Sequence, residues 1–279
     1  MAPKTTAELL EIIDDLNDAW DTGTETVPFH PLRNSKNKRI EGLELVRGSA
    51  ILGLGRHVVK TAQAIRLLID NDMATSAIPL TRMVFECALT SALLANSKDD
   101  HGVKSMLKDY ARFRGLLKSD SMQAATETFR DGAQHITDDD MTPFSGSYDH
   151  LRNFQQVCMD LTPAGTDAYI IFRILSAYSH ATVKNSDTYF TPNDSEILPY
   201  YVPDPDAPIG ADFLLWLTAA SMVWSGRPVS YVTKDKTHRS ELRRCARELG
   251  TKADLEVSEA YRQRHIKAKR AAKMSSSST

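Results

Sequence analysis

Apolar residues recur every three or four positions along most of this chain, and no run of alternating residues demands a β-sheet. Such spacing is typical of amphipathic helices, whose period is 3.6 residues. The first segment of this kind, residues 6–20, places Leu9, Ile13 and Leu16 on one face. Further helices are predicted near residues 41–69, 74–96, 100–131, 147–160, 163–183, 209–226, 235–249 and 253–273.

Turn-forming residues collect between these segments, at 22–39, at 138–146 and, over the longest irregular stretch, at 185–208. Thirteen glycines and twelve prolines are few for 279 residues, which argues against an all-β fold with many tight turns. We therefore predict an all-α fold, a single large helical bundle with a basic C-terminal helical arm. The core is expected to consist of the helices at 41–69, 74–96, 100–131 and 163–183.

Three parts of the chain follow from this pattern. Residues 1–39 are predicted to form an N-terminal helix and loop, residues 40–233 the main bundle, and residues 234–279 basic helices with a disordered tail. The net charge of -2 conceals an asymmetry, because residues 234–273 contain thirteen Lys and Arg against six Asp and Glu. Such an arm is suited to an acidic partner such as nucleic acid, a membrane surface or a protein, although a solvated helix face has the same composition.

Cysteine usage and the N-terminus indicate an intracellular protein. Cys87, Cys158 and Cys245 are odd in number and far apart, as expected in a reducing cytoplasm rather than in a disulfide framework. The N-terminus is acidic and lacks the apolar segment of a signal peptide. The uncharged stretch 213–224 is much shorter than the roughly 20 residues that a bilayer requires, so no membrane span is predicted.

Common cofactor and metal motifs are missing from the sequence. Gly53 and Gly55 lie within a helical pattern, without the preceding strand and third glycine of a dinucleotide loop, and they more simply allow another helix to approach closely. There is no phosphate-binding Gly-Lys-Ser/Thr loop and no Gly-x-Ser-x-Gly elbow. No glutamate lies three residues before a histidine, as a di-iron bundle would require. We therefore expect neither a cofactor nor a metal.

One predicted helix carries a line of polar side chains within an apolar segment. Tyr169, Arg173, Ser176 and His180 are separated by four, three and four residues, a spacing that places them on one helix face. Arg173 and His180 are two turns apart, about 10 Å. The surrounding residues are so apolar that this helix is expected to be largely buried.

Charged residues buried in this way need partners, because an unpaired buried charge is very costly. The apolar segment 77–95 supplies Arg82 and Glu86, which are four residues apart and share a face. The sequence therefore predicts that Glu86 packs against Arg173 or His180.

The combination of LTRMVFECAL at 80–89 with FRILSAYSHATV at 172–183 resembles the HEPN superfamily of helical bundles, in particular an uncharacterised bacterial branch with an Arg-x-x-x-Glu helix and a later Ser-x-x-x-His helix. The resemblance covers roughly residues 40–185. It implies an RNase site formed by Arg173 and His180, usually at a homodimer interface, in a toxin or phage-defence setting. The sequence departs from the family pattern at Ile174, where a polar residue commonly follows the arginine.

Metal-independent RNA cleavage is compatible with these side chains. Histidine suits general acid–base work at neutral pH, arginine binds phosphate with two hydrogen bonds, and Ser176 could orient either group. Tyr189, Phe190, Tyr200 and Tyr201 could stack on bases or pack their loop against the bundle. Two alternatives remain. The polar line could be purely structural in a module that binds a protein or a small ligand, or the chain could bind nucleic acid without cleaving it.

Overall fold

A computed structural model gives the conformation of most of the chain. The residues that it describes are 4–21, 30–32, 38–97, 100–137, 151, 153–191, 199–203 and 205–276. The predicted loop at 22–39 lies largely outside these residues. The predicted loop at 138–146, the beginning of the predicted helix at 147–160 and the tail at 277–279 lie outside them entirely.

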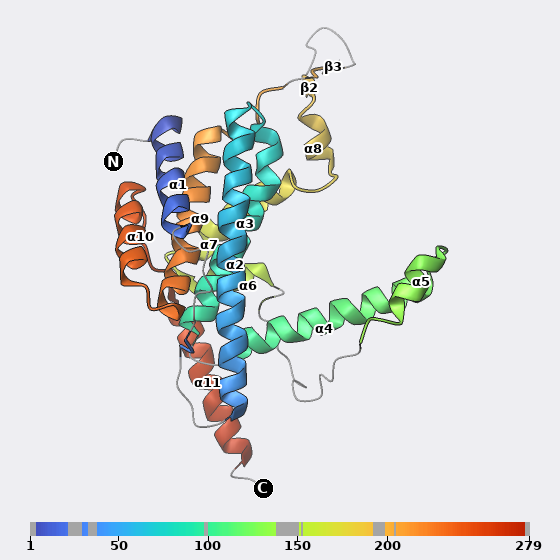
Figure 1. Cartoon of the computed structure of the whole chain (residues 1–279), viewed down its shortest axis with the longest axis vertical. Helices are drawn as coiled ribbons and strands as arrows, with labels where there is room; N and C mark the ends of the chain where they lie inside the picture. The colour runs from blue at the N-terminus through green and yellow to red at the C-terminus, as the bar shows by residue number, and fades with distance from the viewer. Residues whose placement is uncertain are drawn as a thin grey trace.

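The described residues form an all-α bundle, as predicted (Figure 1). Its centre consists of α2 (Lys38–Asp70), α3 (Ala74–Asn96) and α9 (Ala211–Val232), which pack against one another. α1 (Thr6–Asp21) packs mainly against α9, and α10 (Lys236–Glu248) covers α9 and α1. The central position of α9 explains its apolar sequence, because nearly every residue from Leu214 to Val232 is buried.

The apolar core lies between these central helices. Its fully buried side chains include Val59 and Ile65 from α2, Phe85 and Leu89 from α3, and Leu217 and Val223 from α9. Burying one such side chain contributes about 1.5–3 kcal/mol relative to leaving it exposed, so these contacts between distant segments are a major source of stability.

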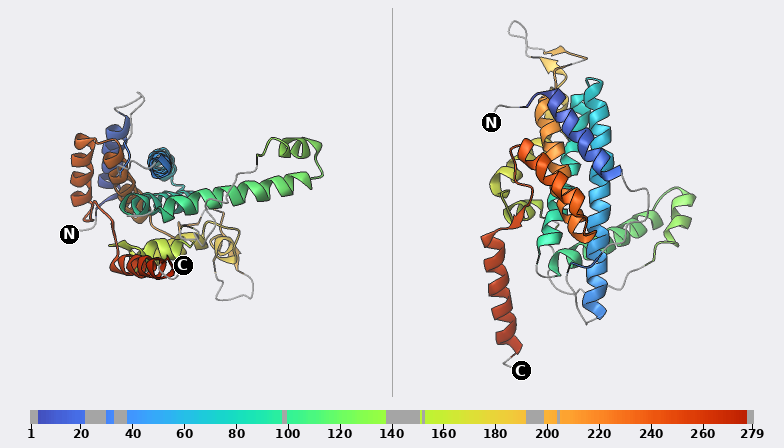
Figure 2. Two further views of the ribbon diagram at one scale, coloured as in Figure 1. Left: turned by 90° about the horizontal axis from the view of Figure 1, so that it is seen from below. Right: turned by 60° about the vertical axis from the view of Figure 1, so that its left-hand side comes forward.

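The prediction of one continuous core helix at 100–131 is wrong. The segment forms α4 (His101–Met122) and α5 (Glu127–Ala133), which fold back on each other and project away from the bundle (Figures 1 and 2). Arg130 stabilises the turn between them by donating hydrogen bonds to the carbonyl oxygens of Ala124 and Ala125. The buried residues of α4 are confined to its first turns, at Gly102, Val103 and Ser105.

Short elements fill the space beside α3. α6 (Phe154–Met159) leads into β1 (Leu161–Thr162), and β1 pairs antiparallel with β4 (Glu256–Val257). This pairing attaches the segment before the basic helix α11 (Glu259–Ser276) to the bundle, and α11 then extends away from it (Figure 2).

The predicted helix at 163–183 is also shorter than expected. It is replaced by α7 (Gly165–Ala177), a turn, and α8 (Val183–Asp187). After α8, β2 (Phe190–Thr191) pairs antiparallel with β3 (Tyr200–Tyr201) within the stretch predicted to be irregular. This small hairpin lies at the end of the molecule opposite α11 (Figure 1).

α3 is the one helix among the described residues that is long and apolar enough to cross a membrane. Most of its apolar window is buried inside the bundle, between α2, α7 and α9. Core helices of soluble proteins have the same length and composition, so this helix is weak evidence for a membrane span.

The two glycines of α2 provide a matched test of helix packing. A Cβ at Gly55 would lie 2.6 Å from Cγ2 of Val229 and 2.9 Å from the Trp20 ring, whereas a Cβ at Gly53 would meet nothing within 4 Å. We expect Gly55→Ala to lower the free energy of unfolding by about 1–3 kcal/mol through overpacking. Gly53→Ala should raise it by about 0.5–1 kcal/mol. Urea denaturation measures both, and an equal gain from the two substitutions would contradict the close approach at Gly55.

Candidate functional site

A cluster of charged side chains lies where α3 passes the end of α7. Arg82 and Glu86 are one turn apart on α3, and the Nη2 of Arg82 donates a hydrogen bond of 3.2 Å to the Glu86 carboxylate. The Nη1 of Arg82 lies 3.3 Å from the Nε2 of His180. Three of the residues singled out in the sequence therefore meet in one place, with His180 exposed and Arg82 and Glu86 half-buried.

His180 reaches this cluster because α7 ends three residues before it. The hydroxyl of Ser179 donates to the carbonyl oxygen of Leu175, and the hydroxyl of Thr182 donates to that of Ala177. These side chains satisfy carbonyl groups that a helix end leaves without partners, so they favour a stop at this point. His180 consequently leaves the helical phase of Arg173 and turns toward α3.

The predicted alignment of four polar side chains on one face is therefore only partly correct. Arg173 is exposed, and its guanidinium lies 6.0 Å from the centre of the Tyr169 ring. Among the described residues it forms no ion pair or hydrogen bond. The hydroxyl of Ser176 donates to the carbonyl oxygen of Phe172, so it is engaged by its own helix rather than by Arg173 or His180.

The expectation that this helix is largely buried is wrong. Only Ala168 and Leu175 of α7 are buried, and Ile170 and Ile174 are about half exposed. α7 lies on the surface of α3 instead of inside the bundle, so only one of its faces contacts the core.

Phe172 also contributes to the cluster, although no motif in the sequence marked it as a site residue. Its ring lies beneath the Arg82 guanidinium, 4.9 Å from centroid to Cζ, and it also contacts Phe154 and Tyr169. A cation over an aromatic face gains about 0.5–1 kcal/mol when exposed and more when desolvated. Its place in the site could have been predicted from helical spacing, because Phe172 lies one turn before Ser176 and therefore on the same helix face.

The geometry sets the protonation pattern of the histidine. Arginine has only donor groups, so a hydrogen bond across this contact requires the Nε2 of His180 to be the acceptor. The proton of a neutral imidazole is then on Nδ1. His180 thus presents an unprotonated nitrogen beside a guanidinium, which is a base next to a group that binds phosphate.

The environment of Glu86 is partly desolvated. Burial raises the pKa of its carboxyl group, and the positive charge of Arg82 opposes this shift. The neighbouring thiol is also affected, because burial and the charge of Glu86 raise the pKa of Cys87 to about 11. Cys87 is therefore a neutral thiol near pH 7 and has no thiolate with which to act as a nucleophile.

Metal-ligating side chains are scattered over the part of the chain that the structure describes. No group of three or more His, Cys, Asp or Glu side chains is arranged there to hold a metal ion. The site therefore consists of an arginine, a histidine, a glutamate and the aromatic rings beside them.

Comparison with known proteins gave one family match. A model described as "Family of unknown function (DUF5677)" matches residues 48–197, more than half of the chain. The matched region contains α3, α7 and the whole cluster around Arg82. Neither the curated proteins nor the solved structures gave a match.

Proposed function

The chain belongs to DUF5677, a family of unknown function, and we propose that it is a metal-independent endoribonuclease in which His180 is the acid–base group. Arg82 is the phosphate ligand in this proposal, whereas the sequence pattern alone favoured Arg173 for this role. Glu86 and Phe172 hold the Arg82 guanidinium in position.

The observation that supports this proposal most is the contact between Arg82 and His180 at a solvent-accessible edge. A purely structural arginine–histidine pair is expected to be enclosed by the core and to have its hydrogen-bonding groups satisfied. His180 is instead exposed, and the Arg82 side chain that contacts it is 21% exposed. A substrate phosphate is thus able to replace the histidine as the partner of Arg82.

The reaction would proceed as follows. A phosphate oxygen of RNA binds to Arg82, which frees the Nε2 of His180 to accept the proton of the adjacent 2′-hydroxyl. The 2′-oxygen attacks phosphorus, and the bond from phosphorus to the 5′-oxygen breaks. The products are a 2′,3′-cyclic phosphate and a 5′-hydroxyl end, the latter protonated by the imidazolium or by water. Arg82 stabilises the negative charge that develops on the phosphate oxygens.

Two arginine substitutions separate the roles of Arg82 and Arg173. We expect Arg82→Lys to reduce cleavage strongly, because lysine keeps the charge but cannot form the planar two-pronged contact to phosphate. Arg173→Lys should have a smaller effect, since Arg173 lies over Tyr169 and not at His180. Cleavage of a labelled single-stranded RNA is measured with EDTA present, with DNA of the same sequence as a control that lacks the 2′-hydroxyl.

The outcomes distinguish this proposal from the non-catalytic alternative. Cleavage that EDTA abolishes would contradict a metal-independent mechanism. A larger loss with Arg173→Lys than with Arg82→Lys would return the phosphate-binding role to Arg173. If the natural protein cleaves no RNA, the cluster is better explained as part of a binding module.

The resemblance to the HEPN superfamily adds proposals about partners and setting. A homodimer is supported by large apolar side chains that α4 leaves exposed in the single chain, namely Tyr110, Phe113, Leu116 and Leu117. A second copy covering them would remove an exposed apolar stripe from water.

The basic helix α11 offers a separate surface for nucleic acid or a protein partner. A cytoplasmic location and a role in toxin or phage defence complete this proposal.

A further inference from the structure

A surface hollow of about 590 Å³ begins at Ala181 and Thr182, the residues that directly follow His180 in the chain. The backbone continues from His180 directly into its wall, where Thr182 N–H donates to the His180 carbonyl oxygen at 2.8 Å. The side-chain amide of Asn185 donates to the same oxygen at 3.4 Å. The residues that line the hollow are Ala181, Thr182, Asn185, Ser186, Tyr189, Phe190 and Tyr201.

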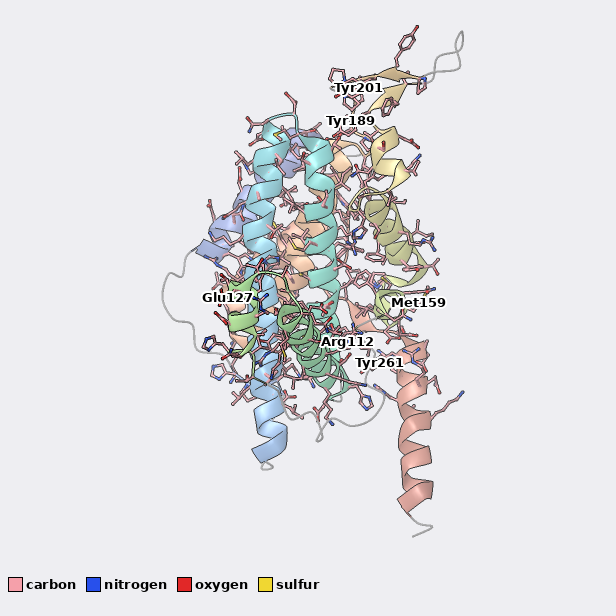
Figure 3. All side chains as sticks on the ribbon, turned by 90° about the vertical axis from the view of Figure 1, so that its right-hand side faces the viewer. Arg112, Glu127, Met159, Tyr189, Tyr201 and Tyr261 are labelled. Carbon is pink, nitrogen blue, oxygen red and sulfur yellow. The ribbon has the colours of Figure 1, made fainter. Side chains whose placement is uncertain are left out.

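Aromatic rings form one side of this hollow. Tyr189, Phe190 and Tyr201 are all more than a third exposed, so they do not pack the loop against the bundle. Phe190 and Tyr201 are directly paired in the β2–β3 ladder, with ring centroids 5.9 Å apart. Figure 3 shows Tyr189 and Tyr201 together at the hairpin end of the molecule. Residues opposite each other share a face of the ladder, so the next pair, Thr191 and Tyr200, projects from the other face.

Polar groups of α8 also line the hollow. The side-chain oxygen of Asn185 and the hydroxyl of Ser186 have no hydrogen-bond partner among the residues that the structure describes. An amide oxygen accepts hydrogen bonds, and a hydroxyl both donates and accepts them. The hollow thus combines aromatic faces for stacking with hydrogen-bonding groups at its edge.

We propose that this hollow binds an unpaired nucleobase of RNA next to the phosphate held by Arg82. The identity of the ligand rests on the proposed function, whereas the shape and chemistry of the hollow do not. Bases stack on exposed aromatic side chains, and their edges are read by hydrogen-bonding groups such as those of Asn185 and Ser186. A base within a duplex is stacked and paired, so it cannot enter. The substrate is therefore single-stranded RNA or an unpaired loop.

Binding is tested with a fluorescein-labelled 2′-O-methyl RNA, used single-stranded and annealed to its complement. This probe has no free 2′-hydroxyl, so binding is measured on the full chain without cleavage. Tyr201→Leu is expected to weaken binding of the single strand by about 5- to 150-fold, the range observed for loss of one stacked base. Tyr201→Phe keeps the aromatic face and should bind nearly as well as the natural protein.

Tyr200→Leu is the matched control, because Tyr200 is exposed on the same hairpin but does not line the hollow. Equal losses for Tyr200→Leu and Tyr201→Leu, or tighter binding of the duplex than of the single strand, would overturn the inference. Selective loss with Tyr201→Leu supports the base site even if the natural protein cleaves no RNA. If Tyr201→Leu cleaves RNA normally and binds it no more weakly, the base-binding proposal is contradicted and the ribonuclease proposal is unaffected.

Discussion

The His180→Ala variant is expected to cleave RNA about 10²- to 10⁴-fold more slowly than the natural protein in the presence of EDTA. Rate factors of this size are typical for a positioned acid–base group. Arg82 would still bind the phosphate, so the loss should fall on kcat more than on KM. Steady-state cleavage of one defined RNA by both proteins measures the two parameters.

A stability measurement separates this catalytic role from a structural one. His180 is exposed, so its replacement should change the free energy of unfolding by no more than about 0.5 kcal/mol. His135→Ala is the control, since His135 is an exposed histidine near the end of the projecting α4–α5 arm. Cleavage that survives His180→Ala, or falls equally with His135→Ala, would remove His180 from the mechanism.

The largest expected effect on stability is that of Arg47→Ala. Arg47 is buried in α2, where its Nε donates to the equally buried Glu44 carboxylate at 3.0 Å. Its Nη1 donates to the carbonyl oxygens of Leu94 and Ser97 at the end of α3. Its Nη2 contacts Asp100 at 3.4 Å, just before α4. Removing the guanidinium would leave a carboxylate and several carbonyl groups buried with fewer partners, at a cost of about 3–5 kcal/mol.

Urea denaturation of Arg47→Ala and of Lys60→Ala provides the comparison. Lys60 is an exposed cation on the same helix, and its loss should cost no more than about 0.5 kcal/mol. The double variant Glu44→Leu/Arg47→Met should regain part of the lost stability, because it removes the buried carboxylate together with its partner. Equal stability of Arg47→Ala and Lys60→Ala would show that this network does not support the junction of α2, α3 and α4.

Several elements followed directly from the sequence. α1, α2, α3 and α10 begin and end within a few residues of their predicted bounds. Hydrophobic periodicity and the residues that begin and end helices are local properties of the sequence. They therefore predict the bounds of a helix wherever it has one apolar face and polar residues at its ends. The proximity of Arg82 to Glu86 was predictable for the same reason, because residues four apart on a helix are neighbours. The hydrogen bond of Glu86 is with Arg82, however, and not with Arg173 or His180, the partners that the sequence predicted.

The separation of His180 from Arg173 could be seen only in the tertiary structure. A continuous helix through His180 would have placed it with Arg173, but the chain turns at Ala177 and brings His180 to Arg82, 98 positions earlier in the sequence. A prediction from hydrophobic periodicity continues a helix until a breaking residue occurs. It does not show where side-chain hydroxyl groups bond to the last carbonyl oxygens and end the helix earlier. Which arginine meets the histidine therefore depends on contacts between distant segments.

The sequence by itself thus determined the all-α class, most of the helices and the residue types of the candidate site. Only the tertiary structure decided that α9 lies at the centre and that α4 projects from the bundle. It also decided that the aromatic residues of the hairpin line one hollow with Ala181 and Thr182, which follow His180 in the chain. The physical reason is the range of the interactions. Helix formation depends on neighbours within one or two turns, whereas burial and the assembly of a site depend on segments whose separation in the sequence carries no local signal.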